Sequence, residues 1–363
     1  DMGITVVELP MGDINTIYDR ITHLYNTYGL KSLVGLYEEE ENAGMHLDRT
    51  RKIVELVKDH PGVWGWSVDD EPVGKSHPAE ELLAVYRLIR SLDTKHPIYS
   101  CDMYPHYFPE LIRYVDVMGT DCYPYGQERA QTHVGNCLEA GKTYTDVNKK
   151  GLLPVLQFFK RNNYFPTGDE MRNMIYQSFF AGSTGLAYYA VTERVDDLYS
   201  YQTPTTETLR DFAGSEQDIF FDVFVHGQGK IFAEQRGQDV WYTTFTDGER
   251  RFVAVMNRSF TEPVSVDVSI PFRKDGERVF VIGGAAANSA TLIGDKAVRI
   301  TLQKAEAALY EVSKAPNIKI SKGNGAIAEK LEKGAITITC AERTEEEEFL
   351  VALYTLRDGK KQL

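Results

Sequence analysis

Short apolar runs alternate with helical patterns over residues 1–214, and this alternation limits the possible folds more than any other feature. The expected strands cover residues 3–9, 30–37, 63–69, 97–102, 114–121, 153–159 and 185–192. The segments between them carry helix signals, including Asp13 as an N-cap and a capping box formed by Thr167 and Glu170. Repeated strand–helix units predict a parallel sheet with helices packed outside it.

Two architectures are built from such units. A doubly wound sheet needs a glycine-rich turn after an early strand, and the sequence has none. A TIM-type (β/α)8 barrel needs eight units, whereas seven are visible here. We expect the barrel, with its first strand missing from this chain. Because its absence would expose two sheet edges, that strand is expected in a longer protein, or a packing partner replaces it.

The pattern changes near residue 225. Residues 225–313 alternate apolar and polar side chains between turn signals, which predicts an antiparallel β-sandwich. Residues 314–363 again resemble strands, but only about three of them, as in a partial immunoglobulin-like segment. The expected organisation is a catalytic barrel over 1–224, an accessory sandwich over 225–313 and a partial β segment over 314–363.

Composition excludes several functions. The formal net charge of −13 and the lack of a Lys/Arg cluster argue against nucleic-acid binding and favour a neutral or cationic ligand. The sequence contains no run of eighteen apolar residues, so no membrane span is expected. The four cysteines form no CxxC pair, so neither a metal nor another cofactor is expected. Cys101 and Cys122 could form a bridge if their strands are neighbours.

Acidic and aromatic residues gather where the expected strands end, which is where a barrel carries its active site. These residues are Glu8, Glu38–Glu41, Asp69, Asp70, Glu71, Asp102, Tyr104, Asp121, Tyr123, Gln157, Phe158, Phe159, Thr192 and Glu193, with Trp64, Trp66, Tyr125, Tyr188 and Tyr189 nearby. Strand parity places Gly65, Ser67, Asp69 and Glu71 on the inner face, and Trp64, Trp66 and Val68 toward the helices. The twist near the strand end could still free Trp66.

Two carboxylates over an aromatic cleft are the groups needed to break a glycosidic bond. One must be protonated to donate to the leaving oxygen, and the other ionised to attack the sugar or activate water. Glu71 and Asp121 are expected to point into the mouth of the barrel. Structural roles remain open: Asp121 could be a turn former, and Glu38–Glu41 and the region of Glu193 could be solvated loops.

The stretch VWGWSVDDEP at 63–72 resembles the fourth strand of clan A glycoside hydrolases, which commonly ends in Asn-Glu-Pro. The resemblance implies that Glu71 is the general acid/base, with Asp70 where the family has Asn. Similarly, VDVMGTDCYPYG resembles the sixth strand, whose aromatic lining residue would be Tyr123. LPVLQFF falls where the seventh strand should be, and it carries Gln157 where the family has its nucleophilic Glu.

A neutral amide cannot act as that nucleophile, and several explanations stay open. Another carboxylate could serve, with Asp121, Asp69 or Glu193 as candidates; the enzyme could be inverting; the barrel could bind sugar without cleaving it; or the Gln could replace an original Glu. The first hypothesis is a glycoside hydrolase of a polysaccharide or oligosaccharide, with Glu71 as acid and Asp121 as base or stabiliser. The alternatives are a catalytically silent carbohydrate-binding barrel and, less favoured, a carbohydrate lyase.

The first hypothesis predicts a set of substrate-binding residues: Asp69, Asp70, Trp66, Tyr104, Tyr123, Gln157, Phe158, Tyr189 and Glu193. The expected partner is a carbohydrate, with no nucleic acid and no membrane span, and a secreted or cell-surface location is favoured over a cytoplasmic one. The sequence does not reveal the oligomeric state.

Overall fold

The computed structural model describes residues 2–10, 12–38, 43–126, 133–189, 204–284, 289–314, 327–332, 335–340, 355–357 and 360–362. In this part of the chain, no helix combines the length and the apolar character needed to cross a membrane.

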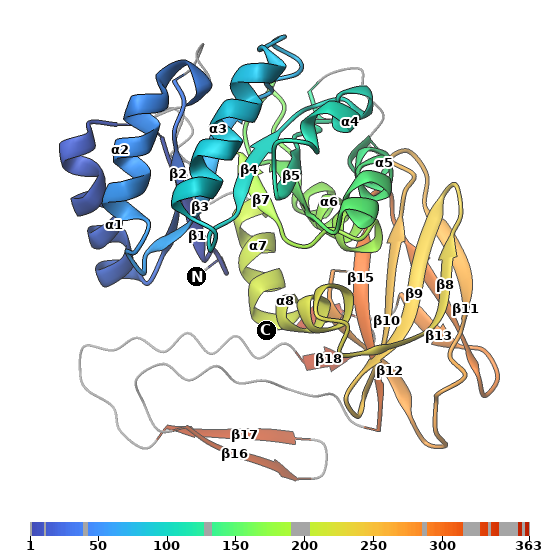
Figure 1. Ribbon diagram of the computed structural model, residues 1–363. Helices are drawn as coiled ribbons and strands as arrows, with labels where there is room; N and C mark the ends of the chain where they lie inside the picture. Colours follow the sequence, from blue (N-terminus) through green and yellow to red (C-terminus); the bar gives the residue numbers. More distant parts are fainter. Residues whose placement is uncertain are drawn as a thin grey trace.

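Seven parallel strands form one curled sheet in sequence order, as expected for a TIM-type barrel (Figure 1). They are β1 (Val6–Leu9), β2 (Lys31–Gly35), β3 (Val63–Asp70), β4 (Ile98–Cys101), β5 (Val117–Thr120), β6 (Gly151–Gln157) and β7 (Ala187–Tyr189). The sequence predicted all seven and their parallel order. Because parallel strands end at one edge of the sheet, the segments that follow them meet there, and we call this edge the mouth.

Helices follow the strands and cover the outer face of the sheet (Figure 1). They are α1 (Ile14–Tyr28), α2 (Leu47–Val57), α3 (Ala79–Leu92), α4 (Phe108–Leu111), α5 (His133–Asn148), α6 (Gly168–Phe180), α7 (Pro204–Ser215) and α8 (Gln217–Phe220). Both predicted N-terminal caps are present. Asp13 accepts a hydrogen bond from the Asn15 amide at 3.0 Å, and Thr167 and Glu170 form the reciprocal capping box. These bonds satisfy amides that would otherwise have no partner at the helix start.

The two faces of β3 differ from the strand-parity prediction. Trp66 and Val68 pack with α1, α2 and α3, as predicted. Trp64 instead joins Leu33, Tyr99, Cys101 and Val155 in an interior cluster on the inner face of the sheet, which corrects its assignment toward the helices. The pairing of β3 with its neighbouring strands explains this change. The register with β2 shifts between Val63 and Gly65, and the register with β4 shifts between Ser67 and Asp70. Each irregularity adds a residue and exchanges the faces of those beyond it.

Antiparallel strands follow the barrel and form two sheets (Figure 1). The five-stranded sheet contains β12 (Arg278–Gly283), β15 (Ala307–Ser313), β10 (Arg250–Asn257), β9 (Val240–Asp247) and β8 (Lys230–Arg236), in that order. The three-stranded sheet contains β11 (Val264–Ser269), β14 (Ala297–Leu302) and β13 (Ala290–Leu292). Val253, Val255, Val298 and Ile300 meet in the core between the two sheets, so this region is a sandwich.

The other face of the five-stranded sheet is also buried. Phe252, Ala254 and Met256 on β10 belong to the same apolar cluster as Met174 of α6 and Phe212 of α7. The amide of Asn173 on α6 adds hydrogen bonds to the carbonyls of Asn257 and Ala305, at 2.8 and 3.0 Å. Barrel and sandwich therefore share one continuous core.

Two antiparallel hairpins are described beyond residue 314: β16 (Ile327–Glu332) with β17 (Ala335–Cys340), and β18 (Thr355–Arg357) with β19 (Lys360–Gln362). The chain is thus a TIM-type barrel followed by antiparallel β structure.

Candidate active site

Glu71 lies directly after β3 in a strained backbone conformation. Its φ of 50° is in the left-handed region, which costs a non-glycine residue about 1–2 kcal/mol. Hydrogen bonds hold it there: its amide donates to the carbonyl of Cys101 at 3.0 Å, and its carbonyl accepts from the amide of Lys75 at 2.8 Å. Backbone strain that the surroundings enforce is typical of functional sites.

Asp102, at the end of β4, fixes the turn that follows Glu71. Its carboxylate accepts hydrogen bonds from the amides of Val73 and Gly74, at 3.0 and 3.2 Å. Burial raises the pKa of Asp102 to about 7, against the lowering effect of these two bonds, and the charge of Glu71 raises the pKa further. Asp102 was expected among the residues at the strand ends, and the structure gives it a specific task there.

Asp121 follows β5 and is a buried carboxyl at the mouth. The residue is 5% exposed, and its Oδ1 has no hydrogen-bond partner among the described residues. Burial, followed by the negative charges of Glu71 and Asp70, raises the pKa of Asp121 to about 8. Glu71 and Asp121 therefore lie close enough for their charges to interact, and both this charge and burial favour the protonated form of Asp121.

Asp69 and Asp70 exchange the positions that simple alternation predicts. Asp69 is buried, and its Oδ2 lies 2.7 Å from Nδ1 of His77, so it anchors the segment leading to α3. Asp70 instead accepts a weak hydrogen bond from the Cys101 thiol at 3.4 Å and lies 3.2 Å from Nζ of Lys75. Its charge also raises the pKa values of Asp121 and Glu8. Asp70 is thus the aspartate of this strand that faces the mouth.

Glu8 was expected among the acids at the strand ends, but neither Glu8 nor Tyr37 was given a catalytic or substrate-binding role. Tyr37 donates a hydrogen bond of 3.4 Å to Oε1 of Glu8, which joins the ends of β1 and β2. Desolvation raises the pKa of Glu8 although part of its surface stays open, and the charge of Asp70 adds to this rise. Glu8 stands at a strand end in the sequence, and that position was the signal available for finding it.

Aromatic rings form one side of the mouth. Tyr123 and Tyr189 stack with ring centroids 6.0 Å apart, and Phe159 meets both edge-on, at 5.0 and 5.6 Å. Tyr189 is 39% exposed, so its ring is available to a ligand. Tyr104 is also exposed, and its ring stacks on His106.

Three of the predicted substrate contacts are buried in the structure. Trp66 is fully buried, and its indole donates to Oδ2 of Asp93 at 2.9 Å on the helix side of the sheet. Phe158 is 2% exposed and packs in the core beside α6, whereas its neighbour Phe159 joins Tyr123 and Tyr189. Gln157 is also fully buried, with its amide bonded to the backbone of Tyr125. Glu193 and Thr192 lie outside the described residues, as do Glu39–Glu41.

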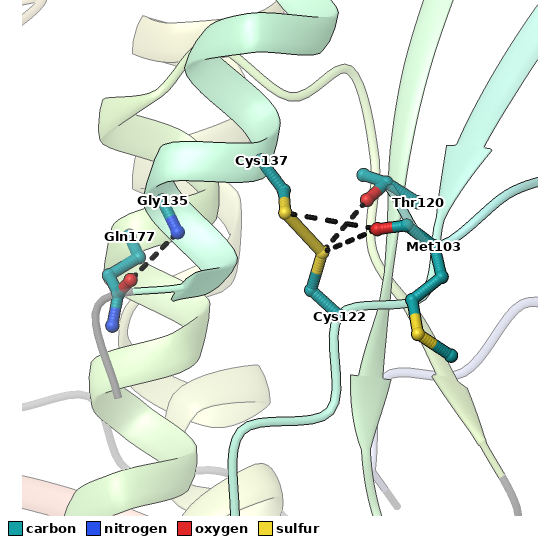
Figure 2. The surroundings of a disulfide bond; sticks show 6 residues. All are labelled: Met103, Thr120, Cys122, Gly135, Cys137 and Gln177. Atoms are coloured by element: carbon teal, nitrogen blue, oxygen red, sulfur yellow. Dashed lines mark hydrogen bonds between the residues drawn. A yellow bond between two sulfur atoms is a disulfide. The ribbon is translucent and has the colours of Figure 1, made fainter. Parts of the chain in front are cut away.

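A disulfide ties the segment after β5 to α5 (Figure 2). It joins Cys122 to Cys137, whereas Cys101 is a free, buried thiol. The bridge considered between Cys101 and Cys122 is therefore corrected. The actual partner lies 15 residues further along the chain, on the helix that packs behind the segment. The bridge holds Cys122, which stands between Asp121 and Tyr123.

Residues 11–157 match the family described as glycosyl hydrolases family 2, TIM barrel domain. This match covers β2 to β6 and includes Glu71, Asp121 and Gln157. No curated protein matches the chain in sequence.

Glycoside hydrolases of several families are among the solved structures with a similar overall fold. A family 39 glycoside hydrolase from the gut symbiont Bacteroides cellulosilyticus WH2 has a TM-score of 0.56 at 12% identity, over 86% of this chain and 76% of that chain. An α-amylase from Geobacillus thermoleovorans, complexed with acarbose, has a TM-score of 0.54 at 10% identity, over 86% and 88%. A GH30 endoxylanase from Clostridium papyrosolvens C71 has a TM-score of 0.52 at 11% identity, over 86% and 90%. Together the comparisons support a TIM-type barrel followed by a β-domain.

Proposed function

We propose that the protein is a glycoside hydrolase that uses Glu71 and Asp121 as its two carboxyl groups. The observation that carries this proposal is the placement of Glu71 and of the buried Asp121, whose Oδ1 has no hydrogen-bond partner among the described residues, at strand ends of one mouth. Burial and the neighbouring charges of Glu71 and Asp70 raise the pKa of Asp121 to about 8. Two carboxyls in different environments, one buried and one more accessible, can supply a protonated acid and a charged group at the same pH. Glycosidic cleavage requires this combination.

The proposed roles follow from accessibility. Glu71 is half-buried whereas Asp121 is almost fully buried, so Glu71 is the carboxyl that reaches the glycosidic oxygen. Asp121 holds the proton of the pair in the free protein. For cleavage, this proton passes from Asp121 to Glu71, which donates it to the leaving oxygen, and the ionised Asp121 then acts as the base or as the stabiliser of the positive charge that develops on the sugar. Stacking of Tyr123, Phe159 and Tyr189 gives the adjoining wall the apolar surface that sugar rings prefer.

Replacing Glu71 by Gln tests this proposal. Glu71→Gln keeps the size of the side chain but cannot exchange a proton, and we expect hydrolysis to fall by at least about 100-fold. The matched control is Glu55→Gln on the exposed side of α2, which is expected to keep full activity. Both are measured as release of reducing ends from a panel of β- and α-linked glycans, with circular dichroism to verify the fold. Full turnover by Glu71→Gln would rule out its role.

A second candidate function is carbohydrate binding without cleavage. Gln157 favours it, because this residue occupies the position where the resembled family has its nucleophile and its amide is engaged with Tyr125. Calorimetric titration of the same glycan panel distinguishes the two functions. Binding without turnover by the unmodified protein would support this second function, and turnover would exclude it.

A further inference from the structure

We propose that Gln157 is a positioning residue, and that its carboxamide holds the cleft segment, residues 121–126, in the shape that aims Asp121 and Tyr123 into the mouth. The inference rests on the proposed function only where it concerns catalysis. The hydrogen bonds between Gln157 and the backbone of the cleft segment do not depend on that function.

The contact is a two-point clamp on one residue. The amide of Tyr125 donates to Oε1 of Gln157 at 2.9 Å, and Nε2 of Gln157 donates to the carbonyl of Tyr125 at 3.1 Å. A further, longer bond of 3.4 Å runs from Nε2 to the carbonyl of Phe159. Gln157 is fully buried, so water cannot replace these partners. The cost of a broken bond would then be the cost of a buried polar group without a partner.

The clamp requires an amide. Tyr125 presents one donor and one acceptor, and a carboxamide offers the complementary acceptor and donor on two adjacent atoms. An ionised carboxylate has only acceptors, so it would satisfy the Tyr125 amide but repel the Tyr125 carbonyl. A protonated carboxyl restores the complementary pattern. The resembled family has a nucleophilic Glu at this position. In this protein the position is occupied by Gln157, which binds the backbone of the cleft segment instead.

Other contacts hold the cleft segment from the remaining sides. The disulfide fixes Cys122 to α5, and Nδ2 of Asn162 donates to the carbonyl of Gly126 at 2.6 Å (Figure 2 shows the disulfide). Gly126 has a φ of 75° and passes so close to the carbonyl of Arg161 that a Cβ atom would lie 2.2 Å from that oxygen. The segment is thus anchored at 122, 125 and 126, while Asp121 and Tyr123 lie between or beside these anchors.

The test compares two substitutions at Gln157. Gln157→Met fills the space but forms neither bond, so we expect the protection of the Tyr125 amide against hydrogen exchange to fall by about tenfold or more. Gln157→Glu at pH 5, where the buried carboxyl is protonated, is expected to retain protection near that of the unmodified protein. The nearby tyrosines Tyr123, Tyr125 and Tyr188 have raised pKa values and stay neutral at this pH, and Asp121, with a pKa of about 8, is also protonated.

Gln177→Met is the matched control. Gln177 on α6 is equally buried, with Oε1 accepting from the amide of Gly135 at 2.8 Å and Nε2 donating to Oδ1 of Asn173 at 2.9 Å. Figure 2 shows that its bond to Gly135 is made on the helix side of the disulfide. We expect this variant to lose stability but to keep the protection of Tyr125.

Two results would overturn the proposal: full protection of Tyr125 in Gln157→Met, or no difference between the Met and Glu variants at pH 5. On a glycan that the unmodified protein cleaves, Gln157→Met is expected to lower kcat by about tenfold or more while KM changes little, because the clamp positions Asp121 for the chemical step. If the unmodified protein cleaves no glycan, the proposed function fails, and the exchange measurement still decides the role of Gln157.

Discussion

At the scale of single residues, Asp121 is a buried carboxyl that lies beside other negative charges. Its pKa is raised from the model-compound value of 3.8 to about 8, so the folded protein holds a proton there that the unfolded chain releases near pH 4. Folding is therefore favoured at low pH, and this contribution is lost as the pH rises from about 4 through 8. Asp102, with a pKa raised to about 7, acts in the same direction.

Asp121→Asn cannot ionise, and we expect it to flatten this dependence. The unmodified protein should lose on the order of a few kcal/mol of unfolding free energy between pH 5 and pH 8.5. The variant should lose less, because position 121 no longer titrates, but its stability should still fall somewhat, because Asp102 does titrate. Urea unfolding at both pH values measures the two slopes. Equal slopes would show that Asp121 is already ionised in the folded protein. The same variant should lose hydrolytic activity at every pH, because Asn can neither pass a proton to Glu71 nor become the negative carboxylate that acts as base or stabiliser.

Residue types were easier to predict than the directions in which they point. The sequence places Glu71 and Asp121 at the ends of nearby strands, and their charges do interact in the structure. A strict two-residue period then assigns the faces of β3 incorrectly at Trp64 and Asp70, because the strand contains irregularities that no pattern of apolar residues reveals. Phe158 and Phe159 show the same difficulty at the end of β6, where one ring faces the core and its neighbour the mouth.

At the scale of elements, the barrel strands and the helix caps were predictable because they depend on local signals. Alternation, length and capping residues act over a few positions, and Asp13 and Thr167 cap the helices that they were expected to begin. The disulfide was not predictable in this way. Its existence depends on α5 packing behind the segment after β5, and spacing in the sequence does not encode that contact.

The disulfide should stabilise the fold and the mouth together. It closes a loop of 15 residues, for which the chain-entropy model gives about 3 kcal/mol. We expect a double variant, Cys122→Ser with Cys137→Ser, to lose about that much unfolding free energy in urea, and reduction of the unmodified protein to have a similar effect. Cys101→Ser serves as a control for the loss of a buried thiol outside the bridge. A double variant as stable as the oxidised protein would contradict the prediction.

At the scale of the whole molecule, β10 joins two bodies that the sequence presents as separate domains. Its even-numbered residues Phe252, Ala254 and Met256 pack against the barrel helices, and Val253 and Val255 fill the sandwich. The sequence predicted the sandwich from alternating and turn patterns. It could not reveal that the outward face of one sheet would also be buried, because a continuous apolar run at 252–256 fits any strand that is covered on both sides.

Because the core is shared, we expect a cavity made on the barrel-facing side of β10 to lower the stability of the barrel. Phe252→Ala removes a fully buried ring at the junction and should cost about 3–5 kcal/mol of unfolding free energy. Ile300→Ala on β14 is the matched control, since its side chain is equally buried but packs only inside the sandwich. In a Trp241→Phe background, the remaining tryptophans of the three in the chain, Trp64 and Trp66, both lie on β3 and report on the barrel alone.

We expect thermal unfolding followed by the fluorescence of Trp64 and Trp66 to shift more for Phe252→Ala than for Ile300→Ala. The reason is that the first substitution opens a cavity beside α6 and α7, which support the barrel, whereas the cavity made by the second is separated from them by the five-stranded sheet. Differential scanning calorimetry of the same variants gives the total loss of stability. The shift in barrel fluorescence can then be compared between the two variants relative to the total stability that each has lost. If the barrel signal responds to neither substitution, the barrel and the sandwich unfold independently and their contact contributes little to the stability of the active site.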